Sequence, residues 1–240
     1  TSMDGVDISI IESDGYNELS CIFNGYYEFD KSLYRELINL RDKILKYEDL
    51  QSYSEEIRSL DRKFTLFNGQ LVNEIKKKVS EQIDLIGFHG QTIFHKASVG
   101  ISKQLGDGKL LSQITKNKVV FNFRQNDLDH KGQGAPLTPI YHLLISNLIN
   151  NRFDLDFPIN IINIGGITNI TQIVNKNFEN LHAYDIGPGN CLIDEWIRNH
   201  TDKKFDKEGQ IAKSGNVDEL IFNQAVENFN IDSFDQSLDV

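Results

Sequence analysis

The stretch INIINIGGITNITQIV, residues 159–174, decides the class of fold. Apolar runs on both sides of Gly165-Gly166 predict two β-strands joined by a glycine loop. Residues 182–185 predict a further strand, which leads through Gly187-Pro188-Gly189-Asn190 into a predicted helix over residues 192–200. Strands that end in glycine loops and alternate with helices indicate an α/β fold.

The same mixture of strands and helices extends toward the N-terminus. Residues 6–10 and 18–29 predict a hairpin around the turn Ser13-Asp14-Gly15. Apolar residues with helical spacing predict two amphipathic helices, separated by a polar break over residues 49–54. Two short apolar runs predict strands that stop at polar loops, and another helix is expected to have Pro136 in its first turn. These helices cover residues 33–44, 57–75 and 136–149, and the strands cover residues 83–88 and 119–123.

Length and composition restrict the class of protein. The 240 residues carry 35 acidic and 25 basic side chains, and the net charge of −10 argues against nucleic acid or an anionic membrane as partner. The longest apolar run, residues 158–167, is shorter than the roughly 18 residues that a membrane span needs. Only Cys21 and Cys191 are present, too few for a disulfide framework. We therefore expect a soluble, cytoplasmic protein.

The length also bears on domain organisation. A chain of 240 residues can hold one large domain or two modest ones. Asn, Arg and Asp interrupt the apolar pattern over residues 150–156, between a predicted helix and a predicted strand. We predict an N-terminal domain over residues 1–152 and the start of a C-terminal domain over residues 153–240.

Glycines beside polar side chains mark three candidate ligand sites. Thr1-Ser2-Met3-Asp4-Gly5-Val6-Asp7 could turn backbone N–H groups toward phosphate, with Asp4 or Asp7 holding Mg²⁺ through water, but a terminal turn explains the same residues. Gly165-Gly166 suit either close approach of a ligand or an ordinary hairpin. Asp185, at a strand end before a helix start, suits either a proton-accepting carboxylate near an anion site or a capped helix.

Two further polar clusters follow predicted strands. His89 lies between glycines in Gly87-Phe88-His89-Gly90-Gln91-Thr92, where a lone histidine is more often structural than catalytic. Arg124 and Asp127 belong to residues 123–137, a stretch too polar and too rich in glycine for a simple connection. The sequence contains no Walker A, Gly-x-Ser-x-Gly or Gly-x-Gly-x-x-Gly pattern, so P-loop, hydrolase-elbow and Rossmann sites lose support.

Six motifs, taken together and in order, resemble the anhydro-N-acetylmuramic acid kinases. The resemblance covers residues 1–217 and implies the fold of the sugar kinase, hexokinase, heat-shock 70 and actin superfamily, in which two ribonuclease-H-like domains bind ATP between them. The motifs are Thr1-Ser2-Met3-Asp4-Gly5-Val6-Asp7, Gly87-Phe88-His89-Gly90-Gln91-Thr92, Gln104-Leu105-Gly106-Asp107, Phe123-Arg124 through Gly132-Gln133-Gly134-Ala135-Pro136-Leu137, Asn163-Ile164-Gly165-Gly166 and Asp185-Ile186-Gly187-Pro188-Gly189-Asn190.

The resemblance also implies a reaction. Kinases of this family open the 1,6-anhydro bridge of anhydro-N-acetylmuramic acid with water and transfer the ATP γ-phosphoryl group to O6. The products are N-acetylmuramic acid 6-phosphate and ADP, and the reaction serves peptidoglycan recycling and amino sugar catabolism. The implied small-molecule partners are the anhydro amino sugar and ATP with Mg²⁺, and a homodimer is possible.

Roles for individual residues follow from the matched motifs and from polarity at strand ends. The resemblance implies that Asp185 is the catalytic base, with Asp127 as its rival. We choose Asp4 and Asp7 as the Mg²⁺ ligands. The residues expected to bind ATP are Thr1, Ser2, Met3, Asp4, Gly5, Val6, Asp7, Gly165 and Gly166. The residues expected to bind the sugar are His89, Gln91, Arg124, Asp127, Gln133 and Asp185.

Three departures from the family pattern shape the alternatives. The glycine usual before Thr1 is absent, and no counterpart of the family's glycine-rich adenosine-binding motif occurs before Val240, so we expect a chain truncated at both ends. Ile186 stands where threonine is common, which removes one hydroxyl contact to phosphate. The alternative to a kinase is a non-catalytic nucleotide-clasp fragment of the same fold. A glycoside-cleaving enzyme ranks last because it would normally need a second carboxylate as general acid.

Overall fold

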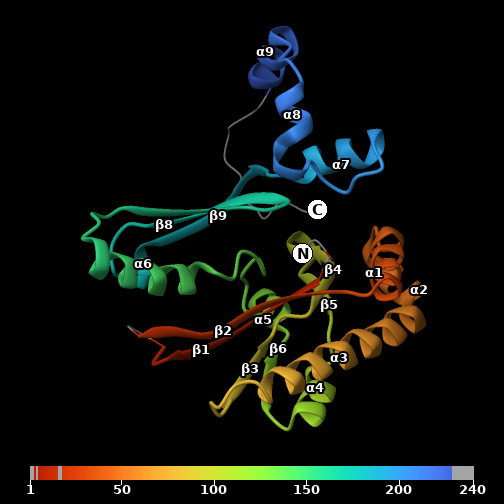
Figure 1. Ribbon diagram of the computed structural model, residues 1–240, viewed down its shortest axis with the longest axis vertical. Helices are drawn as coiled ribbons and strands as arrows, with labels where there is room; N and C mark the ends of the chain where they lie inside the picture. The colour runs from red at the N-terminus through yellow and green to blue at the C-terminus, as the bar shows by residue number, and fades with distance from the viewer. Residues whose placement is uncertain (1–2, 4, 16–17, 229–240) are drawn as a thin grey trace. The chain divides into compact units, whose positions relative to one another are not determined.

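The chain divides between Asp154 and Leu155 into two compact units, each described here by itself (Figure 1). The computed structural model describes residue 3 and residues 5–15 and 18–228. Thr1, Ser2 and Asp4, which the sequence places in a phosphate loop, lie outside the described residues. Both units combine helices with strands, so the predicted mixed α/β class is confirmed.

The first unit begins with the predicted hairpin. β1 (Gly5–Ser13) pairs antiparallel with β2 (Leu19–Glu28), with Val6 opposite Tyr27 and a register shift between Ile10 and Ile11. Side chains of β1 alternate between exposed and partly buried positions, as expected for a strand with one face on the core. Val6 packs against the buried cluster of the unit.

Three helices follow the hairpin and form one side of the core. They are α1 (Lys31–Lys43), α2 (Tyr47–Ser52) and α3 (Ser54–Lys76). The helical spacing predicts α1 and α3 correctly, but the prediction of a break over residues 49–54 is wrong because α2 lies there. The Asp49 carboxylate accepts hydrogen bonds from the backbone N–H groups of Leu45 and Lys46 at 3.0 Å each, which stabilises the start of this polar helix.

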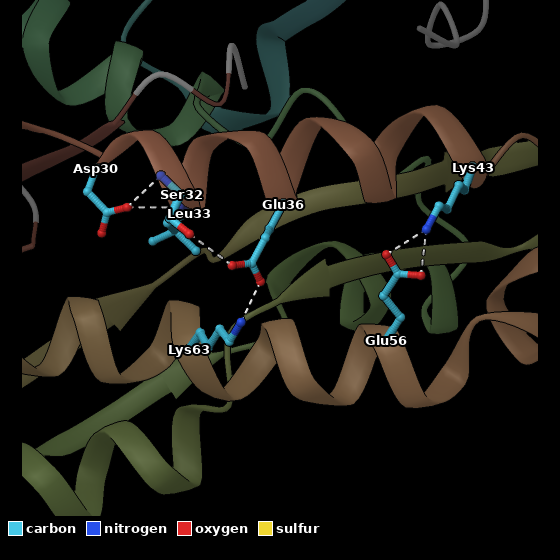
Figure 2. Close-up of polar contacts among 7 residues, drawn as sticks. All are labelled: Asp30, Ser32, Leu33, Glu36, Lys43, Glu56 and Lys63. Carbon is cyan, nitrogen blue, oxygen red and sulfur yellow. Dashed lines mark hydrogen bonds and ion pairs between the residues drawn. The ribbon is translucent and has the colours of Figure 1, made fainter.

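Charged side chains hold the beginning of α1 and bridge α1 to α3 (Figure 2). The Asp30 carboxylate caps α1 by accepting from the Ser32 and Leu33 N–H groups at 2.8 and 2.9 Å. Lys43 donates to Glu56 at 2.8 Å, and Lys63 donates to Glu36 at 2.6 Å. Below these exposed ion pairs, apolar side chains of both helices are buried; they are Leu33, Leu37 and Leu40 of α1 and Ile57, Leu60 and Phe64 of α3.

The rest of the first unit consists of two small sheets and three helices. β3 (Leu85–Phe88) runs parallel to β6 (Lys118–Phe121), and β4 (Gln91–Lys96) pairs antiparallel with β5 (Ile101–Leu105), with a short 3₁₀ turn, η1 (Ala97–Val99), between them. The helices are α4 (Gly108–Thr115), α5 (Phe123–Asp129) and α6 (Pro139–Phe153). The core includes the stacked rings of Phe64 and Phe88, whose centroids are 6.2 Å apart.

Several boundaries in this region differ from the sequence predictions. Gln91 and Thr92 were expected in a loop but begin β4, because Gly90 turns the chain with a φ of 76° directly after β3. Phe123 starts α5 instead of ending a strand. The next helix starts at Pro139, whose missing N–H suits the first turn, and not at Pro136.

The second unit is built on an antiparallel sheet of order β7-β8-β9. β7 (Ile159–Ile164), β8 (Ile167–Ile173) and β9 (Leu181–Pro188) match the predicted strands, although β9 continues three residues beyond Asp185. Thr171 and Ile173 of β8 are buried. The remaining elements are η2 (Phe178–Asn180), α7 (Cys191–His200), η3 (Lys207–Gly209), α8 (Gln210–Ser214) and α9 (Glu219–Asn228). None of the helices described in either unit is long and apolar enough to cross a membrane.

Candidate functional site

In the second unit, the glycine loop between β7 and β8 is tied to the segment that follows β9. The N–H of Gly189 donates to the Gly166 carbonyl at 2.8 Å, and the N–H of Asn190 donates to the Gly165 carbonyl at 2.8 Å. Two motifs separated in sequence, Gly165-Gly166 and Gly187-Pro188-Gly189-Asn190, therefore form one structure.

Glycine is required for packing at one side of this structure but not at the other. A Cβ on Gly189 would overlap the Gly165 carbonyl oxygen and lie 3.0 Å from the Thr168 hydroxyl. On Gly165 a Cβ would lie 3.8 Å from the nearest atom of the described residues, and on Gly166 it would lie 3.9 Å away. Neither of these two glycines has a left-handed backbone. Within the described residues, neither packing nor backbone conformation requires glycine at positions 165 and 166.

Asp185 lies on β9, beside this loop structure. It pairs with Asn169 of β8, and its exposed fraction is 6%. Two residues later Gly187 adopts a φ of 149°, and the chain then turns into α7. Within the described part of the chain, the Asn190 side chain makes no N-cap hydrogen bond, so helix capping does not account for the polar residues here.

In the first unit, the structure brings together three of the predicted sugar-binding residues. Arg124, at the start of α5, donates from Nε to His89 Nε2 at 2.8 Å and from Nη1 to the Gly134 carbonyl at 2.7 Å. The Gly134 N–H donates in turn to Asp127 Oδ2 at 2.7 Å. We call His89, Arg124, Asp127 and Gly134 the guanidinium cluster.

The hydrogen bonds fix the tautomer of His89. A guanidinium can only donate, so Nε2 of His89 is the acceptor, and Nδ1 carries the proton that it donates to the Gly90 carbonyl at 2.7 Å. Burial lowers the pKa of His89 below its ordinary value of 6.5, and the positive charge of Arg124 lowers it further. His89 is therefore neutral at physiological pH.

This pKa can be tested by nuclear magnetic resonance. We expect His89 to titrate below pH 6.5, with a protonated Nδ1 above the transition. The pKa of His89 is lower in the folded protein than in the unfolded chain, so between these two pKa values the unfolded chain binds more protons. The stability that His89 contributes is therefore complete above pH 6.5, and it is lost as the pH falls through the pKa of the folded state. In Arg124→Gln the titration midpoint of His89 should rise, because the positive charge that lowers its pKa is removed. A titration midpoint of His89 at or above pH 6.5 in the wild-type protein would contradict the assigned hydrogen bonds.

The other predicted sugar-binding residues have different positions. Gln91 is buried, and its amide donates to the Thr92 carbonyl at 3.3 Å. Gln133 is exposed and lies next to Gly134 of the guanidinium cluster. Asp127, the rival base, uses its carboxylate to hold the loop at Gly134. Asp185 belongs to the second unit.

Met3 and Gly5, two of the described residues of the N-terminal motif, have packing roles, whereas Asp7 does not. Met3 is 2% exposed and belongs to the core. A Cβ on Gly5 would meet the Tyr27 carbonyl and lie 2.8 Å from the Tyr26 ring. Asp7 is exposed on β1.

Of the two predicted Mg²⁺ ligands, only Asp7 is among the described residues. Within those residues no group of three or more His, Cys, Asp or Glu side chains could hold a metal. Magnesium bound with a nucleotide usually takes one or two carboxylates together with waters and phosphate oxygens, so one exposed carboxylate fits that donor set.

Two residues of α3 that the sequence analysis did not single out hold the motif Gln104-Leu105-Gly106-Asp107. The Asp61 carboxylate accepts from the Gly106 N–H, and the Thr65 hydroxyl accepts from the Asp107 N–H at 2.9 Å. Their signal in the sequence is two polar residues with a spacing of four along a helix whose other buried positions are mostly apolar, with Asn68 as a further polar one.

Comparison with known proteins identifies close sequence relatives. The sequence model of the family described as "Anhydro-N-acetylmuramic acid kinase" matches residues 1–230. A protein of that name from Pelagibacter ubique is 52% identical over 229 residues, which cover 95% of this chain and 60% of the relative. The protein of the same name from Agrobacterium fabrum is 37% identical, and the match covers 90% of this chain and 58% of the relative. The one from Brucella suis is 36% identical, and the match covers 91% of this chain and 58% of the relative. The chain thus spans about three fifths of the length of the curated relatives it matches.

Proposed function

Because this chain belongs to the anhydro-N-acetylmuramic acid kinase family, we propose that the protein opens 1,6-anhydro-N-acetylmuramic acid and phosphorylates it at O6 with ATP. The observation that carries the proposal is the loop structure of the second unit. Two glycines without a packing role, Gly165 and Gly166, are hydrogen-bonded to the segment that directly follows Asp185. This arrangement supports phosphate groups approaching the loop close to a carboxylate.

The chemistry of the substrate explains why a carboxylate is needed. In the anhydro sugar O6 is bonded to C1 and carries no proton, so O6 becomes a nucleophile only when the C1–O6 bond breaks. Water attacks C1, Asp185 accepts the proton of this water, and the released O6 attacks the γ-phosphorus of ATP. The products are N-acetylmuramic acid 6-phosphate, ADP and one proton. General-base assistance typically contributes about 10²- to 10⁴-fold, and the remaining acceleration comes from positioning and electrostatic stabilisation.

The matched motifs indicate which residues would bind the nucleotide and which would bind the sugar. Gly165 and Gly166, with the residues of the motif at positions 1–7, would hold the nucleotide phosphates, and Asp7 with Asp4 would hold Mg²⁺, which neutralises charge on the phosphates when bound. The guanidinium cluster with Gln91 and Gln133 would hold the sugar. The two units would correspond to the two ribonuclease-H-like domains of the actin and hexokinase superfamily. The cellular role would be cytoplasmic recycling of peptidoglycan and amino sugar catabolism, by a protein that could form a homodimer.

A coupled ADP-release assay tests the proposal directly. The complete gene product is incubated with ATP, Mg²⁺ and the anhydro sugar, with N-acetylglucosamine and no sugar as controls. We expect ADP release that depends on the anhydro sugar, and muramic acid 6-phosphate identified by mass. A folded protein that binds ATP but releases no ADP would instead support the non-catalytic nucleotide clasp.

Gly165→Val tests the role of the glycine loop. A Cβ at position 165 makes only ordinary van der Waals contacts within the described residues, so we expect the variant to fold with a melting temperature close to that of wild type. It would crowd the phosphates, and we expect nucleotide affinity to fall by about tenfold or more, which corresponds to roughly 1.4 kcal/mol. Gly215→Val is the matched control, since Gly215 also has room for a Cβ and lies outside the loop. If folded Gly165→Val kept the nucleotide affinity of wild type, the loop would be an ordinary hairpin without a role in nucleotide binding.

A further inference from the structure

We propose that Asp61 and Thr65 of α3 are positioning residues, which hold His89 in place for sugar binding through the loop over residues 104–107. Both side chains bind backbone N–H groups of this loop, and the loop packs on the residues on either side of His89. The effect on sugar binding rests on the proposed function, whereas the effect on His89 concerns the first unit alone and can be measured without any substrate.

Asp61 and Thr65 lie about one helical turn apart on the same face of α3. The Asp61 carboxylate accepts from the Gly106 N–H, and the Thr65 hydroxyl accepts from the Asp107 N–H at 2.9 Å. The Thr65 hydroxyl also donates to the Asp61 carbonyl at 2.7 Å, so its orientation is fixed from both sides. The first turn of α4 has its own cap, the Asp107 side chain, and the two bonds from α3 are additional to it.

Gly106 brings this loop into direct contact with the backbone around His89. Its φ of 131° favours glycine, and a Cβ at this position would lie 2.7 Å from the Phe88 ring and 3.3 Å from the Gly90 Cα. A Cβ on Gly90 would in turn overlap the Leu105 carbonyl oxygen. The loop and the turn after β3 therefore pack without free space between them, so a displacement of Gly106 displaces Phe88 or Gly90.

α3 also contacts this region through an aromatic pair. The Phe64 ring stacks on the Phe88 ring, with the centroids 6.2 Å apart, and both side chains are buried. This apolar contact keeps α3 and β3 together, whereas the hydrogen bonds from Asp61 and Thr65 fix the loop beside them. Loss of one hydrogen bond should therefore shift the loop without unfolding the first unit.

The orientation of His89 depends on the backbone that the loop packs against. The Gly90 carbonyl accepts from His89 Nδ1 at 2.7 Å, so a shift of Gly90 turns the imidazole ring with it. His89 Nε2 then moves relative to Arg124 Nε, from which it accepts at 2.8 Å. A continuous series of contacts thus connects Asp61 on α3 to Arg124 on α5.

Nuclear magnetic resonance of the complete gene product tests this connection. The probe is the Nε–H of Arg124, whose exchange with solvent is slowed by its hydrogen bond to His89. We expect Asp61→Ala to increase this exchange rate by about tenfold or more and to shift the ring nitrogen signals of His89, because the Gly106 N–H loses its acceptor. Asp61→Asn keeps an oxygen that can accept from Gly106, and its exchange rate should stay within about threefold of wild type.

Substitutions of Thr65 give an independent second pair. Thr65→Val keeps the shape of the side chain but cannot accept a hydrogen bond from the loop, whereas Thr65→Ser keeps the hydroxyl. We expect Thr65→Val to change the Arg124 signal in the same direction as Asp61→Ala, and Thr65→Ser to retain the wild-type signal. Glu55→Ala is the matched control, because Glu55 lies on the same helix in an exposed ion pair, and it should leave the signal unchanged. Thermal melting establishes that each variant is folded.

Steady-state kinetics of the complete gene product tests the consequence for sugar binding. In Asp61→Ala we expect the KM for the anhydro sugar to rise by about tenfold, while kcat and the KM for ATP stay within about twofold of wild type. Asp61→Asn should restore the KM for the sugar. A structural role alone would lower the melting temperature of Asp61→Ala but leave the KM of the folded enzyme unchanged.

The outcomes separate the inference from the proposed function. Wild-type exchange of the Arg124 Nε–H in folded Asp61→Ala and Thr65→Val would overturn the inference, and so would faster exchange with an unchanged KM for the sugar. If the wild-type protein releases no ADP in response to the anhydro sugar, the proposed function fails, and the exchange rates then decide separately whether α3 positions His89. Faster exchange and a raised KM for the sugar, both restored by Asp61→Asn, support the inference.

Discussion

Asp185→Asn is expected to reduce turnover by about 10²- to 10⁴-fold while sugar affinity stays close to that of wild type. Asparagine has nearly the same size and shape as aspartate, so the buried position on β9 can accommodate it, but its amide cannot take a proton from water. The rate of ADP release gives the turnover, and calorimetry with the anhydro sugar gives the affinity.

Two control variants sharpen this experiment. Asp194→Asn removes a carboxylate in the first turn of α7, and it should leave turnover within about twofold of wild type because nothing places Asp194 at the reacting atoms. Asp127→Asn keeps an oxygen that can accept from the Gly134 N–H, so it should also retain most activity. If Asp185→Asn kept the kcat of wild type and Asp127→Asn lost most of it, Asp127 and not Asp185 would be the catalytic base.

Leu37→Ala is expected to lower the free energy of unfolding of the first unit by about 2–5 kcal/mol. Leu37 is 0% exposed and lies in the middle of α1, where its side chain belongs to the buried cluster that α1 and α3 share. Shortening it removes apolar contacts and leaves a cavity. Amide hydrogen exchange of α1 and α3 measures the effect in the first unit alone.

The matched control is Glu56→Gln, which removes the ion pair with Lys43 on the same helix pair (Figure 2). Both side chains are about 40% exposed, so water screens the pair and the expected cost is below about 1 kcal/mol. Equal losses in the two variants would mean that the ion pairs, and not the apolar layer beneath them, hold α1 to α3.

Elements with a strong apolar period were predictable from the sequence. The leucines of α1, the apolar residues of α3 and the isoleucines of β7 and β8 all identify their elements before any tertiary contact is considered. By contrast, β5 has five residues, and only its pairing with β4 makes it a strand. The six residues of α2 include no buried side chain, so the sequence has no apolar stripe that would predict this helix.

The candidate site was predictable as a set of residues but not as a set of contacts. Glycine and polar side chains at strand ends single out His89, Arg124 and Asp127. Their connection depends on a carbonyl, that of Gly134, and backbone groups carry no signature in the sequence. The role of Asp61 could not be predicted for a related reason, because its hydrogen-bond partner Gly106 is 45 residues away along the chain.

The two hydrogen bonds from Gly189 and Asn190 to the Gly165-Gly166 loop also have a mechanical meaning. They connect the loop to the segment that directly follows the strand bearing Asp185, so we expect a shift of one to move the other. A nucleotide bound at this loop, as we propose, would thereby adjust the position of Asp185, the proposed base. Substitutions that loosen this coupling should alter the KM for ATP and kcat in concert, even where they touch neither the phosphates nor the carboxylate.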